Sequence, residues 1–196
     1  MNVAALAPLV QATLFTPRQA AAVILAYRPG RDVLWTALAL VAALNTLILV
    51  LLLAASPPQM ALPGYFEAPL ALFFLLTGLL VIYVYALYWA GWALGGQGDI
   101  DTVLMLVIWL QSLRAAAQLA ILLIALLLPP LGMILSLMVA VWGVWILLNF
   151  IVTALQLPTL FHAIATLVVA GIGLILGLGL LISFIGITAQ GLLPHV

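Results

Sequence analysis

The chain of 196 residues is 69% hydrophobic and only 4% charged, and its four arginines balance its four acidic residues. A soluble domain needs about a quarter of its residues charged to cover its surface, so this composition excludes one and requires a lipid bilayer as solvent. The lack of a basic surface excludes nucleic acid as a partner. The absence of cysteine excludes disulfides, thiolate metal sites and cysteine nucleophiles.

Residues 1–32 are predicted to form a cytoplasmic N-terminal segment outside the hydrocarbon, with one short helix. Thr16 is expected to cap this helix, with Pro17 in its first turn and Gln19 completing a capping box. Apolar positions recur at helical spacing at Ala20, Val23, Ile24 and Tyr27. This spacing predicts an amphipathic helix that lies on the membrane surface. Asp32 is placed to cap the helix that follows.

Five apolar runs are each long enough to cross a bilayer core, which takes about twenty residues. They cover residues 33–55, 68–94, 103–128, 131–155 and 164–187. Residues 33–189 are therefore predicted to be an all-α, polytopic bundle of five transmembrane helices, followed by a tail at 190–196. The proline pair 129–130 leaves room only for a tight hairpin, so the third and fourth spans should be antiparallel neighbours. Asp99 or Asp101 is expected to cap the third span.

The arginines that flank the spans predict the orientation. Arg18, Arg28 and Arg31 all precede the first span, so the positive-inside rule places the N-terminus in the cytoplasm. Five crossings then place the C-terminus on the periplasmic side of a bacterial inner membrane. No positively charged region precedes Arg18, and no cleaved leader is expected.

Arg114 is the one charged residue in the apolar run from Thr102 to Leu128. A mid-helix arginine costs about 2.5–3.5 kcal/mol on insertion scales, so it needs polar partners or water inside the bundle. On a helix, Gln111 and Gln118 share its face. Asp101 lies about 20 Å away along the same helix, too far for a direct pair. The other candidate counter-ion is Glu67, if it dips below the interface.

Two interpretations of this polar stripe are open. It can line a polar pathway or anion-binding point, with walls from Asn45 and Thr46 of the first span and Asn149 and Thr153 of the fourth. It can instead be interhelical glue, in which each hydrogen bond contributes about 0.6–2 kcal/mol. The second interpretation is favoured, although intramembrane charges serve function more often than most polar residues do.

Other motifs indicate packing rather than chemistry. Gly173 and Gly177 form a G-x-x-x-G that predicts a helix-packing face. The glycine-rich segment 95–98 is interpreted as a loop, because no strand or phosphate-binding pattern accompanies it. His162 and His195 are predicted on opposite sides of the membrane, which argues against a catalytic base or a shared metal site. No cofactor and no enzymatic activity are expected.

Several segments together resemble a known family. They are the Thr16-Pro17-Arg18 entry, the five spans, the loop at 95–98, the Trp145–Phe150 segment and the Gln156–Leu160 link into a glycine-rich last span. In this layout the chain is similar to the bacterial branch of the Ypt/Rab-interacting (YIP) family. The resemblance implies a five-helix fold with a cytoplasmic N-terminus and no catalytic residues. Eukaryotic relatives bind prenylated Rab-type GTPases, a role that a bacterial member would not share.

The leading functional hypothesis is a non-enzymatic inner-membrane scaffold or accessory factor that binds lipids, other membrane proteins or itself. The alternative is a small oligomeric transporter or channel with a polar route around Arg114. A third hypothesis, an enzyme acting on lipid, has no motif to support it.

Overall fold

The computed structural model describes residues 6–55, 66 and 68–191, with side chains described as far as residue 177 except at Ala55. Within these residues the chain forms seven α-helices and no strand. They are α1 (Leu6–Phe15), α2 (Pro17–Ala26), α3 (Arg31–Ala55), α4 (Pro69–Ala93), α5 (Ile100–Leu127), α6 (Pro129–Leu155) and α7 (Leu160–Gly191).

Helices α3 to α7 are the five described helices that are long and apolar enough to cross a membrane. Each predicted end of a span lies within four residues of the observed end of its helix. The predicted all-α, five-span bundle is therefore confirmed. The largest differences are at α7, which begins at Leu160 and runs to Gly191, into the segment expected to be a tail.

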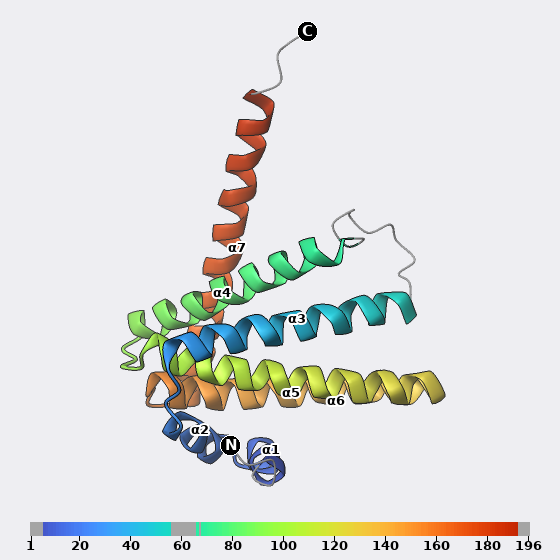
Figure 1. Ribbon diagram of the computed structural model, residues 1–196. Coiled ribbons are helices and arrows are strands. Elements are labelled where there is room, and N and C mark those ends of the chain that lie inside the picture. The colour runs from blue at the N-terminus through green and yellow to red at the C-terminus, as the bar shows by residue number, and fades with distance from the viewer. Residues whose placement is uncertain (1–5, 56–65, 67, 192–196) are drawn as a thin grey trace.

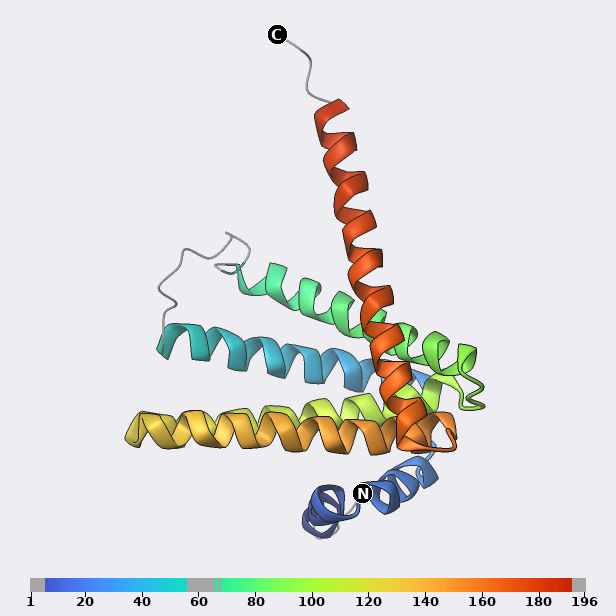
Figure 2. The same cartoon turned by 180° about the vertical axis from the view of Figure 1, so that it is seen from behind.

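Helices α3, α4, α5 and α6 run side by side, whereas α7 crosses them steeply (Figures 1 and 2). The largest interface joins α5 to α6, and Leu128 alone separates these helices, as the tight hairpin requires. A Cβ at Gly132 would crowd the Ala125 side chain, so this glycine permits the close approach of the two helices after the turn.

The loop between α4 and α5 is seated on the end of α6. The backbone N–H of Gln97 donates to the Leu155 carbonyl at 2.9 Å, and the Thr102 hydroxyl donates to the Ala154 carbonyl at 3.2 Å. Asp99 caps α5, because its carboxylate accepts from the Thr102 amide at 2.8 Å, as predicted. The loop therefore supplies acceptors and donors to two helix ends at once.

The N-terminal region differs from the single surface helix that was expected. It forms two helices, α1 and α2, which lie on the outer side of α5 and α6, away from α3 and α4 (Figure 1). We call α1 and α2 the N-terminal pair. Pro17 opens α2 as predicted, but the Thr16 side chain makes no cap; its hydroxyl donates to the Ala12 carbonyl at 3.2 Å, at the end of α1.

The buried face of α2 also differs from the predicted one. Ala20, Ala21 and Ile24 are buried, whereas Val23 and Tyr27 are 50% and 54% exposed. The reason is that α2 packs against α6 and α5 instead of lying free on the membrane, and these helices select its small-residue face. Asp32 lies in the first turn of α3, which begins one residue earlier, and so it does not cap that helix.

Candidate intramembrane polar site

Four of the predicted polar residues line one open pocket of about 150 Å³ between α3, α4 and α5. They are Asn45, Gln111, Arg114 and Gln118, and we call this space the Arg114 pocket. Three of the four come from one face of α5, whose 3.6-residue period stacks positions 111, 114 and 118. The remaining lining is apolar and comes from Ala42, Leu49, Leu52, Leu76 and Leu80.

The pocket lies at the middle of the bundle. Arg114 is 14 residues after Ile100 and 13 residues before Leu127, the two ends of α5. At a rise of about 1.5 Å per residue, its Cα is about 20 Å from either end. The backbone of Arg114 therefore lies halfway along the span, the region where a charged side chain is most costly in a bilayer.

Arg114 has no partner among the residues that the structure describes. Its side chain is exposed, and no hydrogen bond or ion pair to a described residue involves its guanidinium. Asp101, which the sequence placed too far away, pairs instead with Arg31 through two contacts of 3.2 Å at the end of the bundle. Glu67, the other candidate counter-ion, lies outside the described residues.

Asn45 does act across a helix interface. Its side-chain amide donates to the Val41 carbonyl at 2.9 Å in its own helix and to the Gln111 carbonyl at 3.5 Å in α5. Thr46, the other expected wall residue of this span, is buried, and its hydroxyl donates to the Ala42 carbonyl at 2.9 Å. Thus Asn45 forms a hydrogen bond between α3 and α5 at the pocket, whereas the hydrogen bond of Thr46 stays within α3.

Asn149 does not join the Arg114 pocket, contrary to the predicted grouping. Its side-chain oxygen accepts from Arg18 Nε at 2.9 Å, and its nitrogen donates to the Trp145 carbonyl at 2.9 Å. The reason is depth: Asn149 lies six residues, about 9 Å, from the end of α6, whereas Arg114 is about 20 Å from the neighbouring end of α5. Thr153 likewise bonds within α6, to the Asn149 carbonyl.

Sequence reasoning missed the contact that holds the N-terminal pair against α5 and α6. Trp109 Nε1 donates to the buried Thr13 hydroxyl at 3.0 Å, and Trp142 Nε1 donates to the Leu14 carbonyl at 2.9 Å. Together with the bond from Arg18 to Asn149, these place three side-chain hydrogen bonds in one interface. The signal available in the sequence was the pair of tryptophans inside the spans, away from the interfaces where such residues usually gather.

The predicted packing face at Gly173 and Gly177 is not used within the described fold. A Cβ built at either glycine would meet no heavy atom within 4 Å. Helix α7 instead contacts α4 and α6. Among the described residues, nothing packs on these two glycines.

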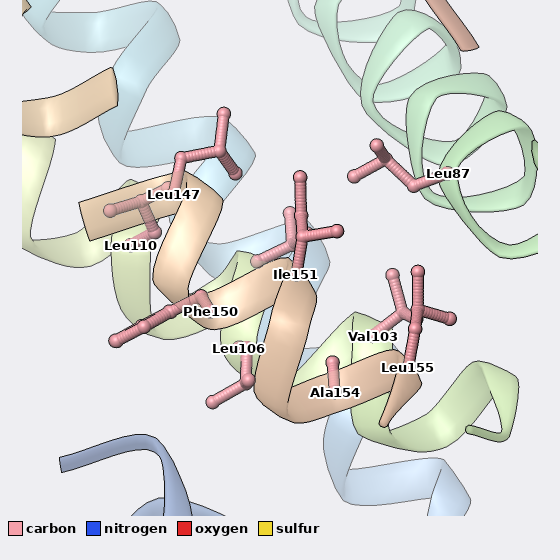
Figure 3. Close-up of a pocket in the computed structure, with 10 residues that line it drawn as sticks. Leu87, Val103, Leu106, Leu110, Leu147, Phe150, Ile151, Ala154 and Leu155 are labelled. Atoms are coloured by element: carbon pink, nitrogen blue, oxygen red, sulfur yellow. The ribbon is translucent and has the colours of Figure 1, made fainter. Parts of the chain in front are cut away.

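Between the Arg114 pocket and the end of the bundle that carries Arg31, α4, α5 and α6 enclose a small space with an apolar lining. Figure 3 shows Leu87, Leu106, Phe150 and Leu155 among the side chains that line a space of about 10 Å³ there. Such a space is at or below the size of a single water molecule, and it offers no polar partner to hold one. The polar lining of the Arg114 pocket is therefore not shared by this neighbouring space between α4, α5 and α6.

The fold and the site define a polytopic α-helical membrane protein with a cation at the centre of its bundle. The chain belongs to the Yip1 domain family: the family model matches residues 12–188, from α1 into α7, and so confirms the resemblance noted above. No curated protein and no solved structure matches the chain.

Proposed function

We propose that this Yip1-family protein is a non-enzymatic scaffold or accessory factor of a bacterial inner membrane, binding other membrane proteins or lipids inside the bilayer. The observation that supports it is that Arg114 lies in an open pocket halfway along α5 and has no partner among the residues that the structure describes. A charge that faces hydrocarbon without a counter-ion is costly, and a binding partner that supplies the counter-ion recovers that cost. The free-energy cost of the cation is thus lower in a complex than in the isolated chain.

The alternative is a small oligomeric transporter with a polar route around Arg114. The polar side chains of the pocket favour it, since such residues mark ion and substrate paths in membrane proteins. The apolar space around Phe150 opposes a route between α4, α5 and α6, because it leaves no room for a file of water. A transporter would therefore need its path between α3, α4 and α5 or at an interface between copies.

A pull-down of the tagged, full-length protein from its native membrane in mild detergent tests the proposal, with mass spectrometry of the retained proteins and lipids. We expect a stoichiometric protein or a defined lipid to be retained by the native chain and reduced with Arg114→Leu. Arg31→Leu is the matched control, because it removes an equal charge at the exposed end of the bundle.

Recovery of the protein alone, together with solute flux in reconstituted vesicles that Arg114→Leu abolishes, would replace the accessory role by transport.

A further inference from the structure

We propose that the Arg114 pocket binds a single carboxylate side chain, of aspartate or glutamate, carried by a transmembrane helix of a different protein. This rests on the proposed function and names the chemistry of the partner. The basis of the inference is charge complementarity between the Arg114 guanidinium and a carboxylate.

The described residues that line the Arg114 pocket include one cation and no carboxylate. The Arg114 guanidinium carries five N–H groups, and the amides of Gln111 and Gln118 lie one helical turn before and after it. Among the described residues, none of these three side chains makes a hydrogen bond. A carboxylate is acceptor-only, takes a guanidinium in a bidentate pair and neutralises its charge, which the uncharged amide oxygens of the two glutamines cannot do.

Size and depth favour a side chain over a phospholipid. A cavity of about 150 Å³ holds a group of the size of benzene, which a carboxyl side chain matches. The hydrocarbon core is about 30 Å thick, so lipid phosphates lie about 15 Å from the midplane where Arg114 sits. A helix that crosses beside α3 and α4 can present a carboxylate directly at that depth.

A second copy of this chain cannot supply the carboxylate. Its four acidic residues are Asp32, Glu67, Asp99 and Asp101. Asp32 and Asp101 lie in the first turns of α3 and α5, Asp99 precedes α5, and position 67 precedes the start of α4 at Pro69. None of the three described ones stands at mid-span, and position 67 comes two residues before α4 in the sequence, so we assign the carboxylate to another protein.

The test uses the full-length protein in phosphatidylcholine vesicles and synthetic transmembrane peptides of about twenty leucine and alanine residues. The peptides carry Glu, Gln or Leu at the centre, and energy transfer to a dye on Gly30→Cys measures association. We expect the Glu peptide to bind about tenfold more tightly than the other two. This preference should vanish with Arg114→Leu and persist with Arg31→Leu.

A charge reversal protects the test against a misfolded variant. Arg114→Glu should bind a peptide with a central lysine and reject the glutamate peptide, which an unfolded protein would not do. Equal binding of all three peptides by the native chain, or a preference for Glu that survives Arg114→Leu, would overturn the proposal.

A measurement of retained lipid distinguishes a carboxylate side chain from a lipid phosphate as the ligand. If the native chain shows no preference for the Glu peptide but retains phosphatidylglycerol in an Arg114-dependent manner, the carboxylate is wrong and a lipid phosphate is the ligand. A partner that is retained in the pull-down regardless of Arg114 would leave the accessory role standing while removing this site from it.

Discussion

Two arginines of this chain have opposite environments, and replacing each by leucine should have opposite effects on stability. Arg18 donates to the buried side-chain oxygen of Asn149, and a hydrogen bond to a charged group contributes about 1.5–3 kcal/mol. Arg18→Leu should lower the free energy of unfolding in detergent by about this amount. Arg114→Leu removes no bond to a described residue and should leave the isolated protein as stable or more stable. A comparable loss in both variants, measured by thermal unfolding, would show that Arg114 acts as glue.

Gly98 is the glycine of the α4–α5 loop whose replacement should cost most. A Cβ at this position would overlap the Ala154 carbonyl oxygen, which belongs to backbone and cannot move aside. Gly98→Ala should therefore destabilise the fold by about 2 kcal/mol or more. Thermal unfolding in detergent measures the loss.

Gly143→Ala is the matched control for the loop, because nothing lies within 4 Å of a Cβ at that glycine. It should leave the transition temperature unchanged or slightly raised, since alanine favours a helix. If both variants unfold together, the contact between the loop and α6 does not hold the bundle end.

The N-terminal pair is an element whose position depends on a few hydrogen bonds to tryptophans. Each indole bond, from Trp109 to Thr13 and from Trp142 to Leu14, is worth about 1 kcal/mol, so the double Trp→Phe variant should open the pair about thirtyfold more often. Limited trypsin digestion after Arg18 measures the opening. Trp89→Phe should digest like the native chain, since Trp89 is exposed and donates no hydrogen bond to a described residue. Equal digestion of all variants would show that apolar packing alone holds the pair.

The elements that sequence alone located are those that a bilayer dictates. Five apolar runs of about twenty residues predict five helices, because a segment that crosses the bilayer must form its backbone hydrogen bonds within itself. Pro129 ends one of these runs and Asp99 precedes another. Helix α1 escaped prediction because ten residues are too few to be a stable helix in isolation, and its contacts with α5 and α6 come from far along the chain. The face that α2 buries depends on its neighbours for the same reason.

The error about Asn149 has a simpler cause that the sequence could have revealed. A hairpin that turns at Leu128 sets residue 114 of α5 level with about residue 142 or 143 of α6. Asn149 is therefore two turns deeper toward the other end, where only an N-terminal partner such as Arg18 reaches it. The helical period of α5 predicts that Gln111, Arg114 and Gln118 share one face. Which residues of α6 lie level with them follows from the position of the turn at Leu128.

At the scale of the whole molecule, charge is concentrated at one end of the bundle. The ends of α4 and α6 and the starts of α3 and α5 meet there, with Arg31 paired to Asp101 and Arg18 reaching α6 (Figure 2). The opposite end, around the α5–α6 turn at Leu128, carries no arginine. This asymmetry is the basis of the proposed orientation, with the arginine-rich end in the cytoplasm.

The orientation can be measured with single cysteines, because the native chain has none. Gly30→Cys stands in open space at the arginine-rich end, and Leu128→Cys replaces an exposed side chain at the opposite turn. A membrane-impermeant maleimide added to intact spheroplasts should label Leu128→Cys and reach Gly30→Cys only after the membrane is permeabilised. The reverse pattern would place the N-terminus outside and remove the positive-inside argument. Labelling of both sites before permeabilisation would show that three arginines are too few to fix one topology, in which case an added lysine beside Arg28 should restore it.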